Sequence, residues 1–118
     1  MKTIIAGSRH MTPTLEDVRT LNKFLTSISE VVSGTARGAD QFGEDWAKAH
    51  GIPLKKFPAE WQKYGRAAGP IRNKQMAEYA DQLIAFLYPG SRGTASMIKQ
   101  AKKLGLKVYI VEKQHTTK

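Results

Sequence analysis

The sequence predicts an α/β domain, specifically a Rossmann-like three-layer α/β/α sandwich around a five-stranded parallel sheet. Short, nearly all-apolar segments alternate with amphipathic segments of helical length, and the connections between them are short. This alternation is typical of parallel strands joined by helices through right-handed crossovers. Three of the apolar segments also end directly in a glycine-containing loop. We expect the strand order 3-2-1-4-5, with the reversal between the first and fourth strands.

Five apolar segments are expected to be strands, at residues 3–6, 30–33, 52–57, 82–87 and 106–111. The first, Thr3-Ile4-Ile5-Ala6, is nearly all apolar, which is typical of a central strand buried on both faces. The third contains Pro53 and two lysines, which favours a position at the edge of the sheet.

Four segments carry the helical pattern, at residues 15–27, 39–50, 70–79 and 95–104, and residues 58–69 are expected to form a longer loop. Thr14 is the expected N-cap of the first helix, Gly51 ends the second, and Pro70 suits the first turn of the third. We expect a single domain over residues 1–112, followed by a polar tail over residues 113–118 that frays.

Length and composition exclude several classes of protein. The chain has 118 residues, which allows one domain with a substantial core but not two. It has no cysteine, which excludes disulfides, cysteine-ligated zinc and thiol catalysis and fits a reducing cytoplasm. No apolar run approaches the roughly 20 residues of a membrane span, and the N-terminus lacks the apolar region of a signal peptide. We therefore expect a cytoplasmic protein without a membrane partner.

The formal net charge of +9 favours anionic partners, such as nucleotides, nucleic acid or an acidic surface. Arginine is unevenly distributed, because five of the six arginines fall in predicted loops or at helix starts and only Arg19 lies within a helix. Lysines 99, 102, 103 and 107 form a small cluster that we interpret as a solvated helix face.

The glycine-containing loops after the first, second and fourth strands are expected to meet at the carboxyl edge of the sheet. Glycine lets the backbone approach a ligand, and the first N–H groups of a helix are unpaired, so a strand–loop–helix order can form an anion site. Ligands of such sheets bind where the strand order reverses, and arginine and hydroxyl groups add donors to phosphate or pyrophosphate. The residues expected to bind such a group are Gly7, Ser8, Arg9, Ser33, Gly34, Thr35, Arg37, Gly38, Asp40, Arg72, Asn73, Gly90, Ser91, Arg92, Gly93 and Thr94.

No loop matches the P-loop or dinucleotide-binding glycine patterns, so the loops alone do not identify the ligand. Trp61 and Tyr64 of the long loop are candidates to stack on a base, and the alternative for Trp61 is to anchor that loop on the core.

Acidic candidates are few. Asp40 follows Gly38 at a helix start, where it is a simple first-turn residue, a ligand contact, or the partner of Arg37 or a ribose hydroxyl. It is the one weak catalytic candidate, since Glu60 is expected to be solvent-exposed.

A metal site is not expected, because His10, His50 and His115 show no metal-ligand spacing. His10 lies near the first loop and is an alternative ligand contact, and His50 is interpreted as a helix-end residue. We expect neither a metal nor a cofactor.

Several motifs in order resemble those of the YspA-like (DUF2493) branch of the SLOG superfamily. The superfamily groups the DNA-processing protein DprA/Smf with the LOG "lysine decarboxylase-like" proteins, and the resemblance covers about residues 3–111. The segments that carry it are Ile4 to Arg9, Ser33-Gly34-Thr35-Ala36-Arg37-Gly38-Ala39-Asp40, Phe57-Pro58-Ala59-Glu60-Trp61 through Tyr64-Gly65, Gly69-Pro70-Ile71-Arg72-Asn73 and Ser91-Arg92-Gly93-Thr94.

The resemblance implies a Rossmann-like domain that binds a nucleotide or nucleotide-derived ligand, in a superfamily associated with nucleotide signalling and phage–host conflict. By analogy, the ligand phosphate would lie on the Gly90–Thr94 loop and near Gly7–Arg9. The LOG phosphoribohydrolases carry Pro-Gly-Gly-x-Gly-Thr-x-x-Glu, in which the glutamate takes part in cleavage. Here the glutamate position is Met97, and Arg72-Asn73-Lys74-Gln75-Met76 matches the family's Arg-Lys-x-x-Met run only in part.

Three functions remain open from the sequence. The first is binding of a nucleotide-like small molecule, as a sensor or a sequestering protein. The second is a nucleotide-processing hydrolase related to the LOG phosphoribohydrolases, with Asp40 or Glu60 replacing the missing glutamate, so enzymatic activity is left undecided. The third is a single-stranded nucleic-acid binder of the DprA type, which would make a nucleic acid the partner. A homo-oligomer is expected in each case, because related domains often pair.

Overall fold

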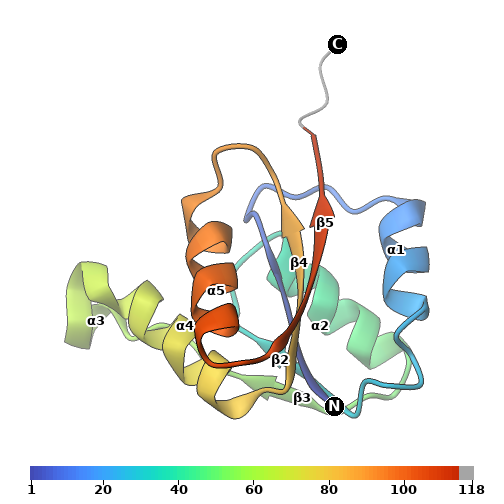
Figure 1. The fold of residues 1–118 in the computed structure, drawn as a ribbon, viewed down its shortest axis with the longest axis horizontal. Helices are drawn as coiled ribbons and strands as arrows, with labels where there is room; N and C mark the ends of the chain where they lie inside the picture. Colours follow the sequence, from blue (N-terminus) through green and yellow to red (C-terminus); the bar gives the residue numbers. More distant parts are fainter. Residues whose placement is uncertain (115–118) are drawn as a thin grey trace.

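The five strands form one all-parallel sheet in the order β3-β2-β1-β4-β5, which confirms the predicted fold class and strand order (Figure 1). The computed structural model describes residues 1–114. β1 and β4 lie side by side from Thr3 opposite Gln82 to Gly7 opposite Phe86, so the strand order reverses between them as predicted. The strands are β1 (Lys2–Gly7), β2 (Glu30–Ser33), β3 (Leu54–Lys56), β4 (Gln82–Leu87) and β5 (Lys107–Glu112).

Helices cover both faces of the sheet. They are α1 (Leu15–Asn22), α2 (Ala39–Ala49), α3 (Trp61–Tyr64), α4 (Ala68–Tyr79) and α5 (Arg92–Lys103), with a 3₁₀ turn, η1 (Gly65–Ala67), between α3 and α4. α1 and α2 contribute to the hydrophobic cluster on one face, and α4 and α5 to the cluster on the other. α3 continues the α4 layer away from the sheet, at the left of Figure 1.

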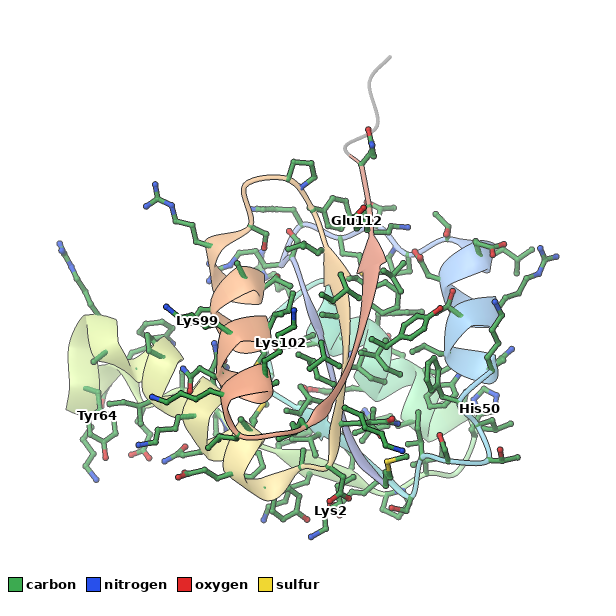
Figure 2. The ribbon with its side chains drawn as sticks, viewed as in Figure 1. Lys2, His50, Tyr64, Lys99, Lys102 and Glu112 are labelled. Carbon is green, nitrogen blue, oxygen red and sulfur yellow. The ribbon has the colours of Figure 1, made fainter. Side chains whose placement is uncertain are left out.

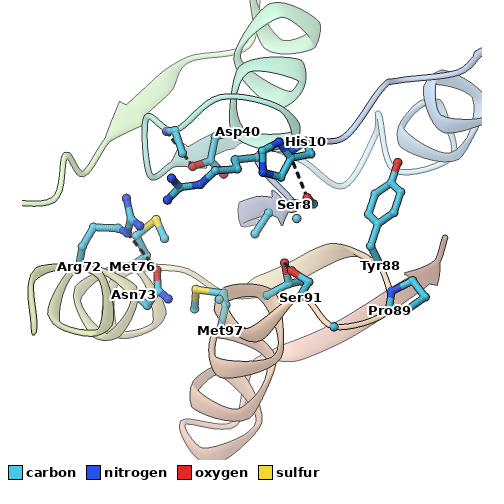
Figure 3. Close-up of a pocket in the computed structure, with 17 residues that line it drawn as sticks. Ser8, His10, Asp40, Arg72, Asn73, Met76, Tyr88, Pro89, Ser91 and Met97 are labelled. Carbon is cyan, nitrogen blue, oxygen red and sulfur yellow. Dashed lines mark hydrogen bonds between the residues drawn. The ribbon is translucent and has the colours of Figure 1, made fainter. Parts of the chain in front are cut away.

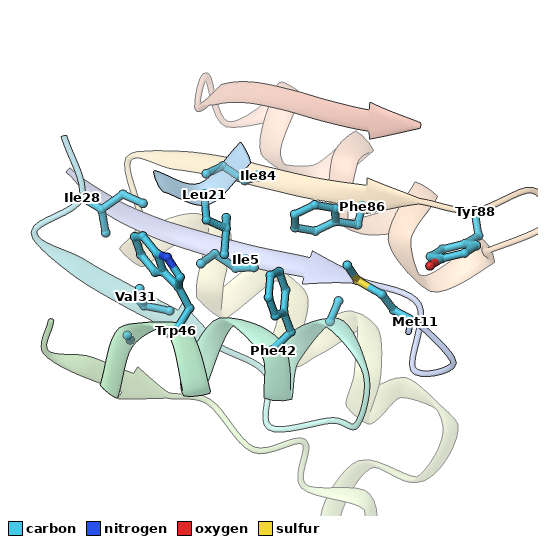
Figure 4. Close-up of a cluster of buried hydrophobic side chains, with 12 residues drawn as sticks. Ile5, Met11, Leu21, Ile28, Val31, Phe42, Trp46, Ile84, Phe86 and Tyr88 are labelled. Atoms are coloured by element: carbon cyan, nitrogen blue, oxygen red, sulfur yellow. The ribbon is translucent and has the colours of Figure 1, made fainter. Parts of the chain in front are cut away.

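Consecutive side chains of the central strands supply the two clusters. Ile5 of β1 packs on the α1–α2 side, where the rings of Phe42 and Phe86 meet edge to face at 5.8 Å between centroids (Figure 4). Ile4, its neighbour, packs on the α4–α5 side with Met97. Because both isoleucines are fully buried, β1 is the central strand that its apolar run predicted.

The helix after β1 is shorter than predicted, because α1 ends at Asn22 and not at Ser27. Its start is as expected: the Thr14 side chain accepts a hydrogen bond from the Asp17 N–H, and the Asp17 side chain accepts one from the Thr14 N–H. After Asn22 the backbone continues in turns, and the Ser27 hydroxyl bonds the Phe24 carbonyl. Hydroxyl residues that bond the local backbone compete with helix in this way.

Two further boundaries differ from the prediction. Residues 58–69 are not one loop, since they contain α3, η1 and the start of α4. The last helix begins at Arg92 and not at Ala95, with Ser91 as its N-cap, so residues 92–94 belong to its first turn. The sequence placed both starts too late because glycines at 65, 69 and 93 were interpreted as loop residues.

The end of the described chain is tied to the body of the domain. Lys113 begins the predicted tail, yet its N–H donates to the Leu87 carbonyl at 2.8 Å and its ammonium group contacts both Asp17 oxygens at 2.8 Å. His115 and the rest of the predicted tail lie outside the described residues. Within residues 1–114, no helix combines the length and apolar character needed to cross a bilayer.

Candidate functional site

A cleft of about 430 Å³, called here the switch-point cleft, lies at the carboxyl ends of β1 and β4 (Figure 3). Its walls come from the loop after β1, the start of α2, the α4 helix, and the loop and first turn of α5. This is the place where the reversal of strand order leaves the two crossovers on opposite faces. The predicted site residues that line it are Gly7, Ser8, Arg9, Asp40, Arg72, Asn73, Gly90, Ser91, Gly93 and Thr94.

Close backbone packing fixes the loop after β1. A Cβ added at Gly38 would lie 2.3 Å from the Ser8 carbonyl oxygen, and Gly38 has a φ of +70°. The Ala39 N–H donates to the same carbonyl at 3.1 Å. The first and second loops are therefore held against each other, and only glycine fits at position 38. Gly38 itself lies outside the cleft lining and shapes it from behind.

The first turn of α5 forms the opposite wall. Its N-cap, Ser91, makes no side-chain capping bond to the helix, and its hydroxyl instead lies 2.7 Å from that of Thr94. The N–H groups at this helix start consequently have no side-chain acceptor, and they carry the positive end of the helix dipole. A Cβ added at Gly93 would meet nothing within 4 Å, so the space above this turn is open to a ligand.

Arg72 of α4 reaches across to the second loop. It donates through Nη1 to the Gly34 carbonyl and through Nε to Asn73 Oδ1 at 3.0 Å. Burial lowers the pKa of Arg72, and nearby Arg9 lowers it further while Asp40 raises it. The guanidinium remains charged at neutral pH, because arginine titrates far above it.

Asp40 supplies the single acidic side chain in the lining of the cleft as described by residues 1–114. Its side chain is 8% exposed, and Oδ2 accepts the Ala36 N–H at 3.0 Å. Burial raises the pKa of the Asp40 carboxyl; the Ala36 hydrogen bond and Arg72 oppose that rise, and Glu44 adds to it. The carboxyl is thus a loop anchor that is also accessible from the cleft.

A second cavity of about 760 Å³, called here the side cavity, adjoins the cleft and shares Arg9, His10, Ala36 and Arg72 with it. Gly34, Thr35 and Arg37 line this cavity but not the cleft. Trp61, which is 56% exposed, also lines it. Tyr64 lines neither space, and the Lys63 ammonium group lies 5.0 Å from its ring centroid.

Besides Gly38 and Tyr64, two further predicted residues line neither the cleft nor the side cavity. Ser33 is buried, donates to Glu44 Oε2 at 2.6 Å and accepts the Thr35 N–H at 3.0 Å, so it supports the second loop from inside. Arg92 is exposed and lines a separate hollow beside β5.

The structure adds lining residues that the sequence did not select. Tyr88 and Pro89 immediately precede the Gly90 loop, so adjacency to the glycine could have found them. Met76 and Met97 also line the cleft, and their apolar character concealed them among core positions (Figure 3). Met97, at the position of the LOG glutamate, is 2% exposed.

The histidines and acids do not form a metal site in the described part of the chain. His10 lines both spaces, whereas His50 caps α2, with Nδ1 2.9 Å from the Trp46 carbonyl oxygen. No group of three or more His, Cys, Asp or Glu side chains suited to a metal ion occurs within residues 1–114. Glu60 lies outside the lining of both spaces.

Fold and site together define a class of protein: a doubly wound parallel α/β domain with a donor-lined cleft at its switch point. Residues 1–64 match the model of the YspA, cpYpsA-related SLOG family, and the chain belongs to that family. The Gene 61 protein of Mycobacterium phage D29 is 34% identical over 84 residues, which are 66% of this chain and 67% of that protein.

A solved structure of the DNA processing protein A (DprA) from Streptococcus pneumoniae shares the fold, with a TM-score of 0.71 and 18% sequence identity. The match covers 92% of this chain and 49% of the DprA chain. The protein therefore corresponds to about half of that structure, and the likeness is one of fold.

Proposed function

We propose that the protein binds a nucleotide or nucleotide-derived small molecule through its phosphate groups, as a sensor or a sequestering protein. The observation that carries the proposal is the donor set of the switch-point cleft. An α5 start without a side-chain cap faces Arg9 and Arg72, with one carboxyl among them. Such an arrangement favours a phosphate or pyrophosphate over a cationic or neutral ligand.

Arg9 is the side chain best placed to grip the ligand. It is exposed and lines both the cleft and the side cavity. It makes no hydrogen bond or ion pair with any other residue of the described range 1–114, so its donors are available. A phosphate at the first turn of α5 would leave the rest of the ligand near the side cavity, where Trp61 offers a ring face to a base.

Binding is favoured over hydrolysis because Met97 stands at the motif position of the glutamate of the LOG phosphoribohydrolases and lines the cleft. A thioether cannot transfer a proton or stabilise an oxocarbenium ion. One observation favours the hydrolase alternative, since burial raises the pKa of Asp40, as expected of a general acid. The anchoring bond from Ala36 and the nearby Arg72 point to the structural role instead.

Calorimetric titration with a panel of nucleotides and nucleotide-derived signals tests the proposal, with chromatography of the bound fraction. Arg9→Ala should weaken binding by about 1.5–3 kcal/mol, the range of a charge-assisted hydrogen bond. Arg92→Ala is the matched control, because it removes the same group from beside the cleft. Equal affinity of wild type and Arg9→Ala would show that the ligand does not bind in the switch-point cleft. Recovery of base and ribose phosphate would establish that the protein is a hydrolase.

A further inference from the structure

The net charge of the chain is confined to two segments. Residues 61–77 and 92–107 contain nine of the 19 lysines and arginines and none of the ten acidic residues. The remaining 85 residues carry ten charges of each sign and are formally neutral. The first segment covers α3, η1 and α4 up to Ala77, just before Glu78, and the second covers α5 and the turn to Lys107 at the start of β5. α3, α4 and α5 pack in sequence on one side of the sheet. These helices hold eight lysines and arginines and one acid, Glu78, so most of the +9 lies in one layer of the molecule.

Eight of these nine cations are exposed, and together they are called here the basic face. Arg72, the ninth, belongs to the cleft. The basic face consists of Lys63, Arg66, Lys74, Arg92, Lys99, Lys102, Lys103 and Lys107. None of the eight forms an ion pair with another residue in the described part of the chain.

The cations of α5 lie on the side of the helix that faces away from the sheet. Thr94, Met97, Ile98 and Ala101 form the buried stripe of this helix. At 3.6 residues per turn, Arg92, Lys99 and Lys103 project within about 40° of one another, directly opposite that stripe. They extend over about 16 Å along the helix axis, and Figure 2 shows Lys99 and Lys102 on its surface. The helix thus presents a row of cations, flanked by Lys102, to the solvent.

The other outer helices of the same molecule do not share this pattern. α1 pairs Glu16 with Arg19, and α2 bonds Gln41 to Asp45 on its exposed side. Mixed charges of this kind are the ordinary composition of a solvated helix surface. Glu78, near the end of α4, is the single acid of α3, η1, α4 and α5, against eight lysines and arginines, and α5 itself has none. This excess departs from a mixed surface, so the interpretation of lysines 99, 102, 103 and 107 as a merely solvated face is incomplete.

We propose that the basic face is a docking surface for the phosphate backbone of a nucleic acid, separate from the switch-point cleft. A nucleic acid presents a regular row of negative charges, which complements a row of cations along a helix. A membrane-binding helix also inserts apolar side chains. The outward positions between the α5 cations are Ala95, Ser96 and Gln100, which cannot insert.

Fluorescence anisotropy with labelled single-stranded and duplex oligonucleotides of about 20 nucleotides, over about 50 to 200 mM salt, tests this proposal. The variant is Lys99→Gln/Lys103→Gln. The matched control is Lys23→Gln/Lys48→Gln, which removes the same charge from exposed positions of the α1–α2 layer. The first variant should lose roughly 10- to 100-fold in affinity at low salt, and its single-strand salt slope should be shallower by about 1.4. The control should stay within about twofold of wild type.

Four results would overturn the proposal. Equal losses of oligonucleotide affinity in the two double variants would show that binding responds to total charge alone. Failure of the wild type to bind any oligonucleotide at low salt would show that the protein has no nucleic-acid binding activity. Displacement of the oligonucleotide by inorganic pyrophosphate at constant ionic strength would place it in the cleft. Stronger binding to phosphatidylserine vesicles or to polyglutamate than to either oligonucleotide would assign the face to a membrane or an acidic protein. Binding that resists pyrophosphate and depends on Lys99 and Lys103 would support it.

Discussion

The buried carboxyl of Asp40 anchors the second loop and also lines the cleft, so its protonation affects the stability of the fold. Its pKa is raised above the ordinary 3.8 by burial, so the folded state holds a proton that the unfolded state has already lost. The contribution of Asp40 to the unfolding free energy therefore falls as pH rises from 3.8 through the raised pKa. At pH values above the raised pKa this contribution no longer changes with pH. Asp40→Asn keeps an acceptor for the Ala36 N–H but cannot titrate.

We predict that the unfolding free energy of Asp40→Asn, relative to wild type, increases with pH across that window. Denaturant titrations at a series of pH values measure the difference and cancel the titration of the other carboxyl groups. Glu60→Gln, in which an acid outside both cavities is neutralised, should give a difference that does not change with pH. A difference that falls with pH would mean that Arg72 outweighs burial at this carboxyl.

Lys113 and Asp17 form a second pair for which burial determines the effect of mutation. The Asp17 side chain is 2% exposed and that of Lys113 is 16% exposed, so the loss of either partner leaves a charge in a poorly solvated place. Lys113→Met should destabilise the fold by about 3 kcal/mol in thermal or chemical unfolding. Asp17→Asn/Lys113→Met should recover part of that loss, because no unpaired charge remains.

The surface pair of Arg19 and Glu16 provides the contrast. Both side chains are well exposed, at 65% and 72%, and water screens their interaction. Arg19→Met should change the unfolding free energy by less than about 0.5 kcal/mol. A comparable loss in both lysine and arginine variants would show that burial does not control the Lys113 pair.

Among the secondary-structure elements, α2 approaches β1 more closely than any side chain at position 43 would allow. A Cβ added at Gly43 would lie 2.9 Å from Ile5 Cβ, in the middle of the core. Gly43→Ala should therefore destabilise the fold by about 1–3 kcal/mol, although alanine has the higher helix propensity. Gly93→Ala in α5 meets nothing within 4 Å and should stabilise by up to about 1 kcal/mol. Unfolding curves of the two variants measure this difference in sign.

The same elements show which features the sequence could predict. The strands could be predicted from the sequence because apolar runs such as Ile4-Ile5 reflect burial on both faces, which leaves a strong local pattern. Helix ends were harder to predict because they depend on contacts between residues that are distant in the sequence. Asn22 ends α1 and also accepts the Trp46 indole N–H at 3.0 Å, a bond across 24 residues that no local pattern encodes.

At the scale of the whole molecule, the sheet topology places the first and fourth loops at one cleft, and that placement was predictable from the order of strands and helices. The hydrogen-bond partners of individual polar groups could not be predicted in this way. Ser33 resembles a phosphate ligand in sequence, but its hydroxyl is committed to Glu44, eleven residues away on α2. Arg92 resembles one too, yet its place in the first turn of α5 directs it outside the cleft.

The segregation of charge also has an energetic consequence for the folded state. Lys99 and Lys103 are four residues apart on one helix, where like charges repel by roughly 0.2–0.5 kcal/mol per pair, and no acid of that helix offsets them. Lys99→Gln should therefore raise the unfolding free energy slightly at low ionic strength, and the gain should vanish as added salt shortens the screening length. Lys48→Gln removes a cation three residues from Asp45 in the last turn of α2, and should lower stability or leave it unchanged. Chemical denaturation at low and high salt measures both effects. Stabilisation by Lys48→Gln as large as that by Lys99→Gln would mean that repulsion is spread over the whole surface and not concentrated in the α3–α5 layer.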